Sequence, residues 1–263
     1  MSDTLSVTRD GTTARVTLRR PKVRNAFNAE LIAALHRAFS ELAVEPPGAL
    51  RAVVLAGEGK TFSAGADVEW QRAAISLSLE ENEADAARLQ AMLLAIDECP
   101  VPVIARVHGA ALGGGMGLCA VADVVLATAD TLFGFTETKL GIMPAVISPF
   151  VLARIGEGHA RALFPAGERF DAGRALRIGL VHEVLPDEAA LDLRVAAILA
   201  ELLAAGPTAA RGAKAVIRDQ RGMTPAEARA MAVQRAARQR VSAEGQEGLT
   251  AFLEKRPPPW RSS

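Results

Sequence analysis

The chain has 263 residues, of which 50% are hydrophobic and 23% are charged, which is typical of a soluble protein with a well-filled core. Thirty basic and thirty acidic residues leave no formal net charge, and no basic run or arginine-aromatic block is present. This balance argues against a nucleic-acid partner, and the longest apolar run is too short for a membrane span.

The N-terminal half of the chain alternates predicted strands and helices. Leu5–Arg9 and Ala14–Arg19 flank Asp10-Gly11, a pattern that predicts a β-hairpin. The other elements expected in this half are helices over 31–42, after the N-cap Asn28, and over 89–96, and strands over Ala52–Ala56, Val103–Val107 and Val124–Ala127. This alternation predicts an α/β fold with buried strands.

The last part of the chain changes character, because helical patterns follow one another without a strand. Thr224-Pro225-Ala226-Glu227 is a capping box with proline at the first helical position. Helices are predicted over Leu191–Leu203, Thr208–Ile217 and Pro225–Val241, and near Glu244–Glu254. We therefore divide the chain into an α/β core over 1–186 and a helical region over 187–263 that folds back or packs on a partner subunit.

The cysteines and the N-terminus indicate a cytoplasmic protein. Cys99 and Cys119 lie in apolar surroundings, as buried thiols do, and no disulfide framework is expected. The first ten residues lack the basic-then-apolar pattern of a signal peptide. The four histidines show none of the spacings of a zinc site, so no metal is expected.

Three segments carry possible chemistry: the turn 60–67, the triplet Gly113–Gly115 at a helix start, and Glu137 within the segment 133–141. Small residues at two strand ends allow two backbone N–H groups to form an oxyanion hole. Glu137 has apolar neighbours that would raise its pKa and suit it to acid/base work. From composition alone, a surface carboxylate that pairs with Lys139 or caps a turn is the simpler interpretation.

Longer motifs resemble those of the enoyl-CoA hydratase/isomerase (crotonase) superfamily. The matching segments, in the family's order and spacing, are RPKVRNAFN, FSAGAD, HGAALGGG, ADVVLATADTLFGFTETKLGIMP, GERFDAGRALRIGLVHEVLP and AFLEKRPPPW. The resemblance covers essentially the whole chain. It implies a spiral of ββα units with a helical C-terminal region that builds trimers, commonly paired into hexamers, and a place in fatty acid or branched-chain amino acid metabolism.

The same resemblance assigns roles to individual residues. The oxyanion hole for the acyl-CoA thioester falls on the N–H groups of Ala66 and Gly114, and the acid/base on Glu137. Coenzyme A is part of the substrate, so no separate cofactor is implied. The residues implied to hold it are Lys22, Arg24, Ala26, Ala64 and Asp67, with Phe252 and Lys255 reaching the coenzyme A of a neighbouring subunit. For Lys22, Arg24 and Lys255, an ordinary solvated charge is an equal alternative.

One position departs from the family's hydratase pattern. Hydratases commonly carry a first glutamate two positions after the glycine triplet, where this chain has Gly117. Two carboxylates divide the work of adding water across a conjugated thioester, whereas one can suffice for a 1,3-proton shift. The run 141–150 nevertheless resembles the bacterial branch that hydrates methylglutaconyl-CoA or isoprenylglutaconyl-CoA. We hypothesise that Gly117 leaves room for the branch or carboxylate of such a substrate.

We consider four hypotheses about the function. The favoured hypothesis is an enoyl-CoA hydratase, with a branched glutaconyl thioester as one candidate substrate, and the second is an enoyl-CoA isomerase with a single glutamate. Another thioester-enolate reaction, such as decarboxylation, and a non-catalytic protein that binds acyl-CoA or RNA remain open. Glu69, Glu83 and Asp85 lie near the segment that covers the acyl pocket, but the sequence singles out none as a second acid/base. Trp70 and residues 71–83 are expected to form a mobile, substrate-shaping loop or helix.

Overall fold

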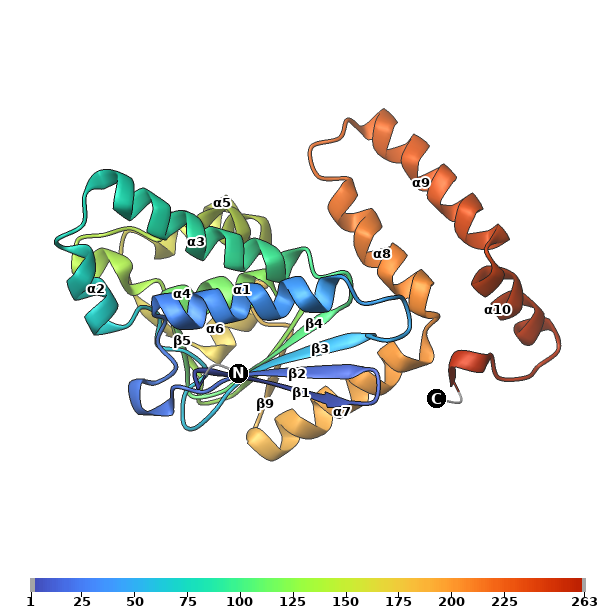
Figure 1. The fold of residues 1–263 in the computed structure, drawn as a ribbon, viewed down its shortest axis with the longest axis horizontal. Coiled ribbons are helices and arrows are strands. Elements are labelled where there is room, and N and C mark those ends of the chain that lie inside the picture. The colour runs from blue at the N-terminus through green and yellow to red at the C-terminus, as the bar shows by residue number, and fades with distance from the viewer. Residues whose placement is uncertain (1–2, 262–263) are drawn as a thin grey trace.

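The structure is a computed structural model that describes residues 3–261, and it is built on a six-stranded sheet with helices on both faces (Figure 1). The strands are β1 (Leu5–Asp10), β2 (Thr13–Leu18), β3 (Ala52–Gly57), β4 (Val103–Val107), β5 (Ala110–Leu112), β6 (Val124–Thr128), β7 (Leu132–Gly134), β8 (Arg169–Asp171) and β9 (Glu183–Leu185). The helices are α1 (Ala29–Ala43), α2 (Val68–Ala74), α3 (Leu79–Asp97), α4 (Gly114–Val121), α5 (Ser148–Leu163), α6 (Ala172–Arg177), α7 (Glu188–Ala204), α8 (Pro207–Asp219), α9 (Pro225–Val241) and α10 (Ala243–Leu253), with 3-10 turns η1 (Pro21–Val23), η2 (Thr136–Leu140) and η3 (Pro259–Arg261).

Successive ββα units of the chain contribute their strands to two sheets. The larger sheet has the order β1-β2-β3-β4-β6-β9, and all its pairs are parallel except the β1–β2 hairpin. The smaller sheet has the order β5-β7-β8. After β4 the chain enters β5 and then α4, and after β6 it enters β7 and then α5. The predicted α/β fold of ββα turns is confirmed.

The large sheet is buried on both faces, which explains its nearly continuous apolar strands. Helices α1 and α3 lie side by side over one face, and α7 crosses the other (Figure 1). Strand residues alternate between the two faces, so Val54, Ile104 and Leu126 pack with Leu191 and Val195 of α7. The first helix of the predicted C-terminal region therefore belongs physically to the core.

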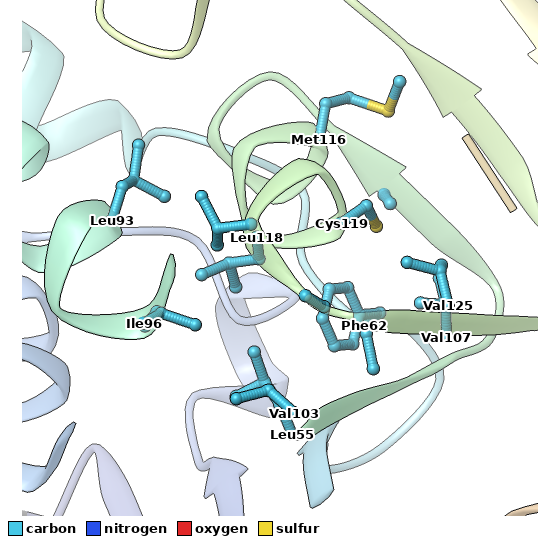
Figure 2. Packing of buried hydrophobic residues seen from close by; sticks show 14 of the residues in the cluster. Leu55, Phe62, Leu93, Ile96, Val103, Val107, Met116, Leu118, Cys119 and Val125 are labelled. Carbon is cyan, nitrogen blue, oxygen red and sulfur yellow. The ribbon is translucent and has the colours of Figure 1, made fainter. Parts of the chain in front are cut away.

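Helix α4 is buried between the sheet and α3. Figure 2 shows Leu118 on the side of Leu93 and Ile96, and Cys119 on the side of Val125. Burial raises the pKa of the Cys119 thiol to about 12, and both cysteines are free and buried, as the sequence indicated. The close packing fixes α4, whose first residues include the glycine triplet.

Helices α8, α9 and α10 extend past the end of the sheet, away from α2 (Figure 1). Polar contacts fasten α8 to the core: Lys214 Nζ lies 2.6 Å from Asp123 Oδ2, and Arg211 donates to carbonyl groups between residues 45 and 50. Glu244 of α10 accepts hydrogen bonds from the Thr208 and Ala209 N–H groups at the start of α8. Within residues 3–261, no helix is long and apolar enough to cross a membrane.

The structural features that we predicted from specific local motifs are confirmed. The hairpin forms, Asn28 caps α1 by accepting from the Leu31 N–H, and the Thr224–Glu227 capping box begins α9. Helix α3 is longer than predicted because a second capping box, Ser78 with Glu81, starts it at Leu79. The segment expected to be a loop or helix is α2, a turn and the beginning of α3.

Candidate active site

The glycine triplet lies where two chain segments approach each other closely. Gly113 has φ +50°, which disfavours other residues, and its N–H donates to Gly134 O. A Cβ on Gly114 would lie 2.8 Å from the Phe27 ring, and one on Gly115 would lie 2.8 Å from Ser63 O. Gly113 is therefore required by its backbone conformation, whereas a side chain on Gly114 or Gly115 would push the neighbouring segments apart.

Two backbone N–H groups remain available beside these glycines. Gly65 O and Asp67 N both bond to Phe27, so Ala66 between them has its N–H on the opposite side of the extended backbone. Gly114 is the first residue of α4, where the N–H has no intrahelical acceptor. Within residues 3–261 neither N–H has a backbone acceptor, and Ala66 and Gly114 line one pocket.

Glu137 reaches the same place from η2. Its Oε1 lies 3.5 Å from where a Cβ on Gly113 would be, and its Oε2 is buried without a hydrogen-bond partner among the described residues. Burial raises the pKa of Glu137 above its ordinary value. A half-buried carboxyl group with one buried oxygen left without a partner, beside two available N–H groups, is suited to exchanging a proton with a bound molecule rather than to holding the fold together.

The pocket has a volume of about 370 Å³. Its walls come from the turn after β3, from α2 and α3, from the start of α4, and from η2 with the segment that follows it. The lining residues are Phe27, Ala64, Gly65, Ala66, Trp70, Gln71, Ala74, Asn82, Asp85, Ala86, Leu89, Gly113, Gly114, Thr136, Glu137, Leu140 and residues 142–147. Trp70 and Gln71 thus shape the pocket, as the sequence predicted for this segment, while the mobility expected of it stays a prediction.

Gly117 requires a correction. It is buried but does not line the pocket, because a Cβ on Gly117 would lie 2.7 Å from Ile147 Cγ2 and 3.3 Å from Leu93 Cδ2. The space that we assigned to a substrate branch is therefore filled by Ile147. This isoleucine belongs to the run 141–150, whose sequence resembles the bacterial glutaconyl-CoA branch, and it lines the pocket itself.

Among the residues near the N-terminal motif and the FSAGAD turn that we predicted to hold coenzyme A, some line the pocket and others lie outside its lining. Ala64 lines the pocket, and its N–H donates to Arg24 O, which joins the FSAGAD turn to the N-terminal motif. Lys22 and Arg24 are exposed, whereas Ala26 is buried and its carbonyl accepts from Arg20. Their contact with coenzyme A stays a prediction.

Asp67 has a structural role. It pairs with Arg20 at 2.8 Å and caps α2 by accepting from the Glu69 N–H. Burial alone would raise the pKa of Asp67, but these hydrogen bonds hold it below its ordinary value. The carboxylate therefore stays charged and fixes the start of α2 beside the pocket.

Phe252 and Lys255 do not reach the pocket of their own chain. They lie at the end of α10 and just after it, and the Phe252 side chain is 79% exposed. Helix α10 and the pocket beside α2 lie at opposite ends of the molecule (Figure 1). A role for either residue near coenzyme A requires a neighbouring subunit.

Sequence reasoning missed several residues of the site. Asn25 is fully buried and donates to Glu58 O and Thr61 O, which holds the N-terminal motif against the turn that leads to Ala66. Phe27 and Asn82 line the pocket. Asn25 and Phe27 lie inside the RPKVRNAFN motif, which pointed to them, whereas no local pattern marks Asn82.

Of the three carboxylates left open as second candidates, the structure brings only Asp85 to the pocket. Glu69 and Glu83 are exposed on the outer sides of α2 and α3. Asp85 is 8% exposed and lines the pocket.

An α/β spiral that places two available N–H groups and a half-buried carboxyl group around one pocket defines an enzyme that can stabilise an enolate and move a proton next to it. The sequence profile of the enoyl-CoA hydratase/isomerase family matches residues 8–263, and the chain belongs to this family.

Individual relatives agree with this assignment. A probable enoyl-CoA hydratase of Rhodobacter capsulatus is 38% identical over 255 residues, covering 93% of each chain. A solved structure of Pseudomonas aeruginosa AtuE is similar with a TM-score of 0.94, 36% identity, and 98% of this chain and 99% of that chain covered. An enoyl-CoA hydratase from Shewanella pealeana gives a TM-score of 0.92 at 36% identity, with 98% and 96% covered.

Proposed function

We propose that the protein is an enoyl-CoA hydratase that works through an enolate held by the Ala66 and Gly114 N–H groups. The observation that carries the proposal is the buried Glu137 Oε2, which has no protein partner in the described chain and lies in the same pocket as these two residues. A buried carboxyl oxygen without a hydrogen-bond partner costs stability, so its position is best explained by a reaction that uses it.

The proposed hydration follows from this arrangement. The water oxygen bonds to Cβ, and the π electrons of the Cα–Cβ bond move onto the thioester oxygen, where the two N–H groups stabilise the charge. Cα takes a proton from Glu137, and the proton lost by the water restores the carboxyl group. Its raised pKa keeps Glu137 protonated to a higher pH than an ordinary glutamate.

A second candidate, an enoyl-CoA isomerase, is favoured by Gly117 and Ile147. An apolar side chain fills the place beside Gly117, so one carboxyl group serves both reacting carbons at this end of the pocket. In isomerisation the Glu137 carboxylate removes a proton from Cα of a 3-enoyl thioester, and the resulting acid returns it to Cγ of the dienolate.

A parallel assay separates the candidates. Crotonyl-CoA, 3-methylglutaconyl-CoA and a 3-enoyl-CoA are followed at the absorbance band of the conjugated thioester. Loss of the band with either of the first two substrates supports hydration, and gain of the band from the third alone supports isomerisation. No change in absorbance with any of the three substrates refutes both candidate functions.

The pH dependence of kcat/KM gives an independent test. Hydration needs protonated Glu137, so its rate falls as the pH rises through the raised pKa. Isomerisation needs the carboxylate, so its rate falls as the pH drops through the same pKa.

The branched glutaconyl substrate is the less favoured form of this proposal. Among the described residues that line the pocket, the side chains that can ionise are the two carboxyl groups of Asp85 and Glu137, and there is no lysine or arginine. A substrate carboxylate would lose its hydration there without gaining a cationic partner. An uncharged acyl chain fits this lining better.

We also propose that the active form is a homotrimer or a hexamer of two trimers. The projecting helices α8–α10 carry large apolar side chains that are more than 70% exposed in a single chain: Ile217, Val233, Val241, Phe252 and Leu253. Exposed apolar groups on a monomer mark an interaction surface. Light scattering at several protein concentrations tests the assembly, and a monomer would contradict it.

A further inference from the structure

The far wall of the acyl pocket is not apolar throughout. On α3, Asn82, Asp85, Ala86 and Leu89 are spaced so that they share one face, and all four line the pocket. Leu89 continues the apolar core side of the helix. Asp85 lies one turn earlier, about 6 Å along the axis. A substrate acyl chain that lies along this face of α3 would therefore pass from apolar to polar surroundings.

Asp85 has one carboxylate oxygen bound and one available. Its Oδ1 accepts from Arg88 Nη2 at 2.7 Å, and the Arg88 side chain is 59% exposed while that of Asp85 is 12% exposed. Within residues 3–261 no donor reaches Asp85 Oδ2, and this oxygen is not among the fully buried atoms. Since Asp85 lines the pocket, this oxygen can meet a bound molecule.

The neighbouring side chain also presents an acceptor. Asn82 Nδ2 donates to the Ala74, Leu77 and Ser78 carbonyls in the turn between α2 and α3, which orients its amide. Its Oδ1 carries no hydrogen bond within the described chain. Two residues that line this end of the pocket thus each have an acceptor oxygen without a donor, and a ligand that supplies a donor can satisfy them.

We propose that Asp85 is a specificity-determining residue that selects acyl chains ending in a hydroxyl group and rejects acyl chains ending in a carboxylate. The inference rests on the proposed function, because it takes the 2-enoyl thioester as the substrate class. A hydroxyl donates to the Asp85 carboxylate, and a hydrogen bond to a charged group is stronger than one between neutral groups. A carboxylate end would meet a like charge in a partly dehydrated site.

The test uses six-carbon and eight-carbon 2-enoyl-CoA thioesters that end in a methyl, a hydroxyl or a carboxylate group. For at least one chain length we expect kcat/KM with the hydroxyl end to exceed that with the methyl end by about tenfold, as one charge-assisted hydrogen bond allows. The carboxylate end should fall below the methyl end by about tenfold or more.

Two variants and a matched control attribute the effect to Asp85. Asp85→Asn removes the charge and should raise kcat/KM for the carboxylate end about tenfold, while Asp85→Leu should make the methyl end the best substrate. Glu83→Gln removes an exposed carboxylate two residues away on the same helix and should change none of these ratios.

Arg88→Met separates selection by Asp85 from recognition of a carboxylate by Arg88. The variant should reject the carboxylate end more strongly, because Asp85 then lacks its cation. If the carboxylate end is the best substrate of the natural protein and Arg88→Met abolishes its turnover, the proposal is wrong. Equal rates for all three ends at both lengths also overturn it while leaving the proposed hydratase intact. If no enoyl thioester reacts, the proposed function itself fails.

Discussion

The packing beside Gly117 can be tested by adding a single methyl group. Gly117→Ala places a Cβ 2.7 Å from Ile147 Cγ2, closer than side-chain carbons approach in folded proteins, so one of the two must move. Ile147 is 2% exposed and has little space to do so. Overpacking of this kind costs about 1–3 kcal/mol of unfolding free energy. The gain in helix propensity inside α4 returns about 1 kcal/mol. We therefore expect a net loss of about 0–2 kcal/mol for the single variant.

The contact itself is isolated by a double-mutant cycle with Ile147→Ala. Ile147→Ala alone should cost about 2–5 kcal/mol, because it leaves a cavity. In the double variant the clash is gone and the new methyl group partly fills the cavity. The double variant should therefore be more stable than the sum of the single effects by about 1–3 kcal/mol.

Urea unfolding at one fixed protein concentration measures the four free energies, since assembly makes stability depend on concentration. Gly212→Ala in α8 is the matched control, because a Cβ there meets nothing within 4 Å and should show only the propensity gain of about 1 kcal/mol. If the single effects add to within about 0.5 kcal/mol, the claim that Ile147 fills the space beside Gly117 is refuted.

Three further substitutions test the site and its support. Glu137→Gln should abolish turnover while binding of acyl-CoA survives; turnover near that of the natural protein would exclude Glu137 as the acid/base. Because burial raises the folded-state pKa of Glu137, the natural protein loses stability relative to this variant as the pH rises from about 4.3 through that pKa, and melting curves at several pH values should show it. Gly114→Ala brings a methyl group within 2.8 Å of the Phe27 ring and should displace one oxyanion donor, lowering kcat about a hundredfold; an unchanged kcat in a folded variant would remove Gly114 from the hole. Arg154→Met should cost about 1–3 kcal/mol in urea unfolding, because its half-buried guanidinium donates to two carbonyl oxygens at the C-terminal end of α4, whereas Arg161→Met, at an exposed pair, should change stability by less than about 0.5 kcal/mol.

Local signals in the sequence were sufficient to predict most of the helices and strands. The hairpin, the Asn28 cap and the Thr224–Glu227 capping box depend on residues within a few positions of one another, and each forms as predicted. The short strands of the second sheet were not predicted, because three residues carry too little periodicity to distinguish them from turns. The family motifs supplied what periodicity could not, the pairing of Ala66 with Gly114 across 48 positions.

The sequence by itself determined the α/β class, the helical C-terminal region and the candidate roles of Ala66, Gly114 and Glu137. The tertiary structure decided which groups share the pocket. It showed that Ile147, thirty residues away, fills the space beside Gly117, and that Asp85 rather than Glu69 or Glu83 lines the pocket. Caps and periodicities arise from neighbouring residues and are visible in the sequence, whereas burial, the raised pKa of Glu137 and the charge of a pocket wall depend on which distant segments pack together.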